Sequence, residues 1–389
     1  MGLVIAYLHF SIIGFSFLLA TDLSFSLWFF FVAFCLMSVG LYAAGLRVPA
    51  IPNYPTRPEA ALQMLGAFLF LGGSVAHALR DQVKQMLASG LHAPGHATGE
   101  DREEPLPYRV ATWGALAGMV AIALWCSVAG MRAWVAVLSF CLLLGVSLVL
   151  TRLVSEGGLL FIQAPFRPTD IYANTVGTAW LTPRDLTVHA FVQRVFMFDL
   201  RTFLMPSFMD SHKLAYETGV SARGLLLPFA VSVLISILFS YVAMLHTAYR
   251  YGAVSLSRWF CNASPQQSFK TLVQWLAEPS KPTTAGYALI AAGGAVTWLL
   301  YLARMRFTWW PLHPLGYAMG PSWPMIQLWF SILIGWVFKS LIMRYATAAS
   351  YHKARHFFLG LVVGEFLAAG VWVLISWVTA TQGIRFFLT

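Results

Sequence analysis

Charged residues are scarce in this chain. Asp, Glu, Lys and Arg make up 10% of its 389 residues, whereas hydrophobic residues make up 59%, and soluble domains carry about 25% charged residues. The mean hydropathy is +0.70. This composition excludes an ordinary soluble protein. It predicts an integral, multi-pass membrane protein, folded as an all-α bundle of transmembrane helices in a lipid bilayer.

Cysteines and catalytic signatures are also few. The four cysteines are scattered, three of them lie inside apolar runs, and we interpret them as small hydrophobic residues rather than metal ligands. Neither a His-Glu-x-x-His nor a Gly-x-Ser-x-Gly pattern is present. We therefore predict neither an enzyme nor a cofactor or metal site. The net charge of +10, without a basic stripe interleaved with aromatic side chains, favours anionic lipid headgroups over nucleic acid as the partner.

Long apolar runs, in contrast, are abundant. A transmembrane helix needs about 20 apolar residues, and on that criterion the sequence predicts nine spans, or ten if one is hidden in 157–223. The stretches 80–109 and 247–285 are expected to be loops. We expect one membrane domain over 1–389, with three spans and a polar loop in 1–108 and the other spans in 109–389. The predicted spans are 2–20, 26–46, 60–79, 110–130, 133–151, 224–246, 286–303, 325–343 and 358–379.

The strongest sign of a broken helix lies in residues 133–166. Arg152 and Glu156 are four residues apart, so a helix places them on one face, and two glycines follow at 157 and 158. In one interpretation this is a discontinuous membrane helix whose freed backbone is covered by protein or by a water-filled cavity. In the other, the helix ends at Thr151 and the two charges lie at the water interface. The sequence leaves both open.

Two ionisable residues lie inside later spans. Glu365 is about one third of the way along 358–379, where a carboxylate costs roughly a few kcal/mol unless it is paired, protonated or facing water. We predict that Glu365 faces the protein interior, either as a proton-coupling group on a transport pathway or as an ion-pair partner of Lys339. Lys339 is explained either by a pathway role or by snorkelling to the interface. Small neighbours of Glu365 are expected to let another helix pack closely: Gly360, Gly364 and Gly370.

The region between the fifth and sixth spans is too apolar for a plain loop. Residues 186–205 carry an interrupted helical stripe, which predicts either an interfacial amphipathic helix or a buried half-helix. After it, Asp210, Lys213 and Glu217 have the spacing of one face of a short helix that ends at Gly219. These three charges form either a solvated face or part of a pathway.

A segment rich in Trp and Pro precedes the eighth span. It runs over residues 307–324 and contains His313. Prolines at four positions forbid a continuous helix. The segment is therefore either an interfacial turn in the aromatic belt or a re-entrant loop that lines a pathway.

Three motifs follow one another along the chain: Asp210-Ser211-His212-Lys213 with Glu217-Thr218-Gly219, His313-Pro314-Leu315-Gly316, and Gly360-Leu361-Val362-Val363-Gly364-Glu365. Their order resembles the C-terminal part of the oligopeptide transporter superfamily. It is still more similar to an uncharacterised bacterial branch related to those transporters, which has stretches like Thr151-Arg152, Glu156-Gly157-Gly158 and 309–314. The resemblance covers roughly 109–380. One departure is that five residues separate Lys213 from Gly219, where the transporter motif has one.

The resemblance implies a function that composition does not. Members of the superfamily are longer and have two related halves, so this chain would correspond to the C-terminal half and a little more. We expect a secondary transporter, or the C-terminal portion of one, for a small polar solute such as a peptide or a metal chelate, coupled to protons. The alternative is a non-transporting structural or accessory subunit of a membrane complex, with a partner subunit or a second copy. The expected location is the bacterial inner membrane, and the candidate pathway residues are Glu365, Arg152, Glu156, Asp210, Lys213, His313 and Lys339.

Overall fold

The computed structural model describes residues 5–45, 57–91, 105–159, 162–200, 203–256 and 259–379, and these contain helices and no strands. Eight helices are long and apolar enough to cross a membrane, which confirms an all-α, integral, multi-pass membrane protein. They are α2 (Thr21–Ala43), α3 (Pro58–Leu91), α4 (Tyr108–Val128), α5 (Ala133–Gly157), α9 (Leu226–Tyr251), α11 (Thr284–Arg306), α13 (Trp323–Tyr345) and α14 (Ala348–Thr379). Each corresponds to one predicted span.

Six shorter α-helices connect or flank these spans. They are α1 (Phe10–Leu18), α6 (Pro168–Thr175), α7 (Pro183–Val192), α8 (Leu204–Thr218), α10 (Ser264–Ala277) and α12 (Pro314–Met319). A π-helical turn, Gln193–Met197, continues α7. The stripe predicted over 186–205 is therefore helical to Met197, but residues 198 and 199 interrupt it before α8 begins at Leu204. α7 buries Leu186 and His189 and contacts α10, whereas Phe191, Val195 and Phe196 of the predicted stripe are exposed, so both alternatives stay predictions.

The first predicted span, 2–20, is not a full transmembrane helix in the part that the structure describes. Its helical portion, α1, has nine residues and is about 13 Å long at 1.5 Å per residue. The hydrocarbon core is about 30 Å thick. Residues 5–9, which precede α1, are not helical. A continuous apolar run was enough to predict a span, but it did not show that the helix begins only at Phe10.

Two predicted loops also differ. Residues 247–285 include α10, whose buried face is made mostly of small polar residues, so a search for apolar runs misses it. The polar stretch 80–109 begins as a continuation of α3 to Leu91, and residues 92–104 lie outside the described ranges.

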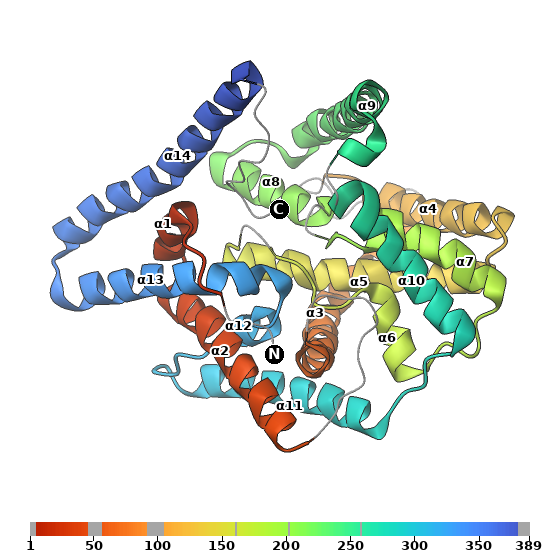
Figure 1. Cartoon of the computed structure of the whole chain (residues 1–389), viewed down its shortest axis with the longest axis horizontal. Coiled ribbons are helices and arrows are strands. Elements are labelled where there is room, and N and C mark those ends of the chain that lie inside the picture. The colour runs from red at the N-terminus through yellow and green to blue at the C-terminus, as the bar shows by residue number, and fades with distance from the viewer. Residues whose placement is uncertain are drawn as a thin grey trace.

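Helices that are far apart in the sequence lie side by side in the bundle (Figure 1). α3 packs along α11, α2 contacts α12 and α13, and α1 contacts both α13 and α14. The α3–α11 crossing is very close, because a Cβ atom on Gly293 would lie 1.8 Å from the carbonyl oxygen of Gln63. The N-terminal helices α1–α3 therefore pack directly against helices of the C-terminal region.

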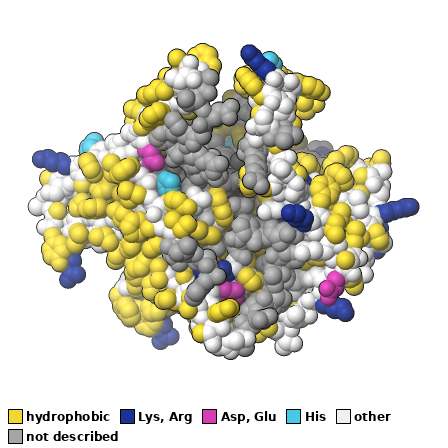
Figure 2. All heavy atoms as spheres, viewed as in Figure 1, with side chains coloured by type: hydrophobic (Ala, Val, Ile, Leu, Met, Phe, Trp, Pro, Cys, Tyr) yellow, Lys and Arg dark blue, Asp and Glu magenta, His cyan; other side chains and the backbone are white. Residues whose placement is uncertain are grey.

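The surface of the bundle is largely apolar. In the view of Figure 2, hydrophobic side chains cover much of the face over α2 and α13, and most Lys and Arg side chains stand at the outline. α9 is the most exposed span, since none of its residues is buried and Phe239 is 75% exposed. An apolar helix with no buried residues is expected to be in contact with lipid.

Candidate functional site

The N-terminal end of α1 is met by a carboxylate from α14. Glu365 accepts a hydrogen bond from the backbone N–H of Ser11 through Oε2, and its Oε1 lies 3.8 Å from Nδ1 of His9. Its side chain is 12% exposed, so it faces the protein interior. The first N–H groups of a helix have no partner within the helix, and the helix dipole places positive charge there. The carboxylate therefore stabilises a helix start inside the bundle.

The non-helical residues before α1 are held by side chains of α13. Ser331 Oγ donates to the carbonyl oxygen of Tyr7 at 3.1 Å and accepts from the N–H of His9 at 2.9 Å. Trp329 Nε1 donates to the carbonyl oxygen of Ile5 at 3.2 Å. Extended backbone at membrane depth is tolerated only where protein or a water-filled cavity satisfies it. Side chains of α13 supply these hydrogen bonds to the backbone of residues 5–9, so the chain before α1 does not have to be helical.

The C-terminal end of α1 is met by an ammonium group. Lys339 of α13 is 6% exposed and donates from Nζ to the carbonyl oxygen of Leu19. It does not snorkel to the surface, and among the described ion pairs it is not joined to Glu365. A cation at a helix C-terminus interacts favourably with the dipole. The two ionisable residues thus occupy opposite ends of α1 rather than pairing with each other.

Two glycines, Gly14 and Gly335, allow α1 to pack closely against α14 and α13. They are not the three glycines around Glu365 that the sequence predicted for close packing. A Cβ atom on Gly14 would lie 2.3 Å from the carbonyl oxygen of Phe358, and one on Gly335 would lie 1.8 Å from Oγ of Ser16. The glycines around Glu365 have no described atom near enough to be a close packing contact. They are Gly360, Gly364 and Gly370, for each of which no heavy atom lies within 4 Å of an added Cβ.

A second irregular segment lies beside α2. All six residues of α12 are buried, and Tyr317 OH donates to Oε1 of Gln63 at 2.9 Å. A Cβ atom on Gly316 would lie 2.4 Å from Cβ of Ser26, and one on Gly320 would lie 2.8 Å from Cβ of Phe30. The second half of the segment therefore packs inside the bundle along α2, whereas Trp309 in its first half is 71% exposed.

His313 acts as the N-cap of α12. Its Nδ1 accepts the N–H of Leu315 at 3.1 Å, which requires an unprotonated Nδ1. Burial, with smaller contributions from Arg304 and Arg152, lowers the pKa of His313 to about 4, although the Asp22 carboxylate opposes the shift. His313 is thus neutral at pH 7 and caps the start of α12.

The Arg152–Glu156 pair forms near the end of α5. Arg152 Nε lies 2.7 Å from Glu156 Oε1, and Nη1 donates to Oγ of Ser74 at 2.8 Å. The helix does not end at Thr151 but continues to Gly157, and Gly158 terminates it with φ +61°. The described residues of 159–164 are not helical. The helix therefore breaks at the glycine pair and not at Thr151, the Arg152–Glu156 pair in its last turn is half-exposed, and the described residues 159, 162 and 164 after the break are buried.

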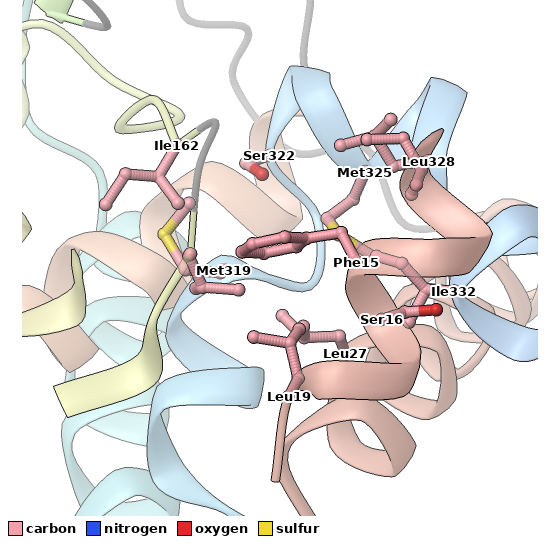
Figure 3. Close-up of a pocket in the computed structure, with 12 residues that line it drawn as sticks. Phe15, Ser16, Leu19, Leu27, Ile162, Met319, Ser322, Met325, Leu328 and Ile332 are labelled. Atoms are coloured by element: carbon pink, nitrogen blue, oxygen red, sulfur yellow. The ribbon is translucent and has the colours of Figure 1, made fainter. Parts of the chain in front are cut away.

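The three irregular segments meet at a small cavity (Figure 3). It has a volume of about 40 Å³, and Phe15 of α1 extends toward its centre, with Ser322 above the ring and Met319 beside it. Ser322 is completely buried, and its hydroxyl has no hydrogen-bond partner among the described residues. The lining residues from the three segments are Ile12, Phe15, Ser16, Leu19, Leu159, Ile162, Met319 and Ser322.

Two predicted site residues lie elsewhere. Asp210 and Lys213 are exposed on α8, which packs on α5, and they do not line the cavity. The prediction of the helix itself is confirmed, because α8 ends at Thr218 and Gly219 follows with φ +73°. These charges form an exposed face.

Sequence reasoning missed a buried polar network around α6 and α7. Arg167 and Asp170 are paired at 2.8 Å with 0% of either side chain exposed. Asp185, also 0% exposed, is 2.6 Å from Arg132. Burial alone would raise the pKa of Asp185, but hydrogen bonds from Arg132 and Thr182 outweigh it and lower the pKa to about 2.

A buried histidine belongs to the same network. Nε2 of His189 lies 3.0 Å from OH of Tyr172. Burial lowers the pKa of His189 to about 4, with a smaller contribution from Arg167, and burial raises that of Tyr172. One sequence signal was available: both α6 and α7 have Pro at the first helical position and Asp at the third, a pattern typical of a helix start.

Comparison with known proteins yields one match. The model of a family described as "Family of unknown function (DUF6785)" matches residues 1–388. No curated protein and no solved structure matches the chain. The function must therefore be argued from the geometry of the site.

Proposed function

The chain belongs to the DUF6785 family of unknown function, and from its site geometry we propose that it is a secondary transporter, or the C-terminal portion of one, for a small polar solute. One observation carries the proposal: α1 is a half-helix inside a bundle of spans, with Glu365 at its N-terminus and Lys339 at its C-terminus. Secondary transporters place substrate and coupling-ion sites at the ends of such discontinuous helices.

The cavity beside α1 supports the same function. Half-helix α1, helix α12 and the residues after Gly158 all contribute to its wall. In secondary transporters such broken segments form a fixed site, and alternating access comes from one group of helices rocking against the other around it. We propose that the solute passes between α1 and α12 when the cavity enlarges.

The roles of the charged residues follow from their positions. Glu365 with His9 is the proposed proton site, and Lys339 anchors the opposite end of α1. Arg152 and Glu156 are proposed to flank the pathway at the end of α5. The solute class, a peptide or a metal chelate, and the location in a bacterial inner membrane are proposed on the motif resemblance alone.

A non-transporting subunit is the second candidate, and one observation favours it. The cavity of about 40 Å³ has room for only a few water molecules, and the charged groups at both ends of α1 already have partners. In that function the same contacts only fix α1 in the bundle. Transport, in contrast, requires one group of helices to move against the other.

Gradient-driven uptake in proteoliposomes tests the proposal. Labelled dialanine and ferric citrate serve as solutes, an imposed pH gradient drives accumulation, and Glu365→Gln is compared with Glu217→Gln, an exposed carboxylate on α8. We expect Glu365→Gln to exchange solute across the membrane without concentrating it, because it mimics the protonated state, and Glu217→Gln to behave like the wild type. Unchanged accumulation by Glu365→Gln excludes the coupling role. Absence of flux for the wild-type chain with either solute favours the subunit.

A further inference from the structure

A wide cleft lies where α2 begins, apart from the cavity beside α1. Its volume is about 650 Å³. The start of α2, the end of α11, the residues that follow α11 and one face of α13 form its walls. The residues that matter most are Asp22, Phe25, Arg304, Trp309, Trp310 and Trp336.

The lining of this cleft changes with depth in the membrane. Asp22 is in the first turn of α2 and Arg304 is in the last turn of α11, so both lie where spans reach the boundary between water and bilayer. Phe25 is one turn further into α2, and Trp336 lies well inside α13. Trp309 is 71% exposed, as expected of an interfacial Trp. Charged groups at the boundary and aromatic rings below them follow the order of headgroup and acyl chains in a phospholipid.

The charges in the cleft are of both signs and are accessible. Arg304 donates from Nη1 to Oδ2 of Asp22, and the two side chains are 41% and 30% exposed. Within the described part of the chain this is the only hydrogen bond of that guanidinium. Its remaining donors suit a phosphate, for which Arg is a preferred ligand. The Asp22 carboxylate, beside Trp rings, suits an ammonium group.

Two donors in the wall have no partner. Nε1 of Trp310 and Oγ of Ser340 are shielded from solvent and make no hydrogen bond in the described residues, and both residues line the cleft. A buried donor without an acceptor is costly.

We propose that this cleft binds a zwitterionic phospholipid. The phosphate contacts Arg304, the ammonium group contacts Asp22, and the glycerol backbone and upper acyl chains lie on Phe25 and Trp336. The site is independent of the proposed transport function, because none of its residues lines the cavity beside α1.

Native mass spectrometry of the full chain, released from detergent micelles, tests this site. Phosphatidylethanolamine and phosphatidylglycerol with identical acyl chains are titrated separately. We expect phosphatidylethanolamine to bind about tenfold more tightly, since one charge-assisted contact is at stake. Asp22→Asn should remove that preference, and Arg304→Gln should weaken binding of both lipids about tenfold. Arg306→Gln, an exposed Arg outside the cleft, is the matched control and should bind like the wild type.

Trp309→Ala keeps the proposal testable if the charge variants fail to fold, because Trp309 is exposed. It should weaken phosphatidylethanolamine binding while the chain stays folded. Equal affinity of the wild type for the two lipids, or unchanged binding by Trp309→Ala, overturns the proposal. Binding of glycerophosphoethanolamine, which lacks acyl chains, as tightly as the intact lipid would make the cleft a solute site and also overturn it.

Discussion

Two ion pairs of this chain have similar spacing in the sequence and very different surroundings. Arg167 and Asp170 are three residues apart and 0% exposed, whereas Arg152 and Glu156 are four residues apart and keep 26% and 48% of their side chains exposed. Their N–O distances are 2.8 Å and 2.7 Å, so the contact geometry does not distinguish them. What differs is the cover: α10 approaches Arg167, whose Nη1 lies 3.4 Å from Oγ1 of Thr271.

The comparison teaches that spacing identifies which charges can pair but not what the pair contributes. An exposed pair contributes about 0–1 kcal/mol, because water solvates either partner when the other is lost. Removing one partner of a buried pair leaves a charge without compensation and costs about 3–5 kcal/mol. The Arg152–Glu156 pair, which stands out in the sequence, is therefore expected to contribute less to stability than the buried Arg167–Asp170 pair.

The largest effect is expected for Asp170→Asn. It keeps the shape of the side chain but leaves the Arg167 guanidinium uncompensated at 0% exposure. The free energy of unfolding should fall by about 3–5 kcal/mol. Thermal unfolding of the purified chain in detergent, or its yield in the membrane fraction, measures the loss.

The matched control for that variant is Glu278→Gln, an exposed carboxylate just after α10. It should leave the unfolding temperature unchanged. Equal stability of Asp170→Asn and the wild type would contradict the assignment of Arg167 and Asp170 as a dry, mutually dependent pair.

An intermediate effect is expected from pH, through the histidine of the same network. The pKa of His189 is lowered from 6.5 to about 4 in the folded chain, so below pH 6.5 the unfolded chain binds a proton that the folded chain does not. Stability therefore rises with pH across this window. The contribution of His189 to stability is complete above pH 6.5 and is lost as the pH falls toward 4.

Unfolding temperatures measured between pH 4 and pH 8 test this expectation by difference. His189→Gln should lose part of the pH dependence, while His313, whose pKa is also lowered to about 4, continues to contribute in both chains. Identical pH profiles for wild type and His189→Gln would show that His189 is not held neutral by burial.

The smallest effect is expected for Glu156→Gln. Arg152 keeps its hydrogen bond to Ser74, and both charges can be solvated, so the free energy of unfolding should change by about 1 kcal/mol or less. The unfolding temperature in detergent measures it. A loss as large as that of Asp170→Asn would mean that the bilayer or a partner covers the Arg152–Glu156 pair.

Most of the fold was predictable because eight spans are long enough to be read from hydropathy. α10 was not, since the face it buries is small and polar: Ser264, Ser268 and Thr271, with Trp275. α8 was predictable to its last residue, because Gly219 adopts the left-handed conformation that ends a helix. A helix end that depends on one local residue could be predicted from the sequence. A helix that buries a polar face could not, because a search for apolar runs does not detect it.

The candidate site divides in the same way. The sequence pointed to Glu365 and Lys339 because charges in apolar runs are unusual, and both lie inside the bundle. It could not show that they occupy the two ends of α1, since their partners, Ser11 and Leu19, are more than 300 residues away in the chain. Asp210 and Lys213 look equally charged in the sequence, yet they are exposed.

By itself the sequence determined that this is a membrane protein. An apolar chain with few charges must pair its backbone groups within helices, and those helices must lie in a bilayer. It also determined where α8 ends, because Gly219, which follows the helix, takes the left-handed conformation of a helix terminator. Only the tertiary structure decided that, in the described part of the first apolar run, the helix begins at Phe10 and residues 5–9 are not helical. The physical reason is that Ser331, Trp329 and Glu365 satisfy its backbone groups, and no local pattern records a hydrogen bond supplied by helices at the other end of the chain.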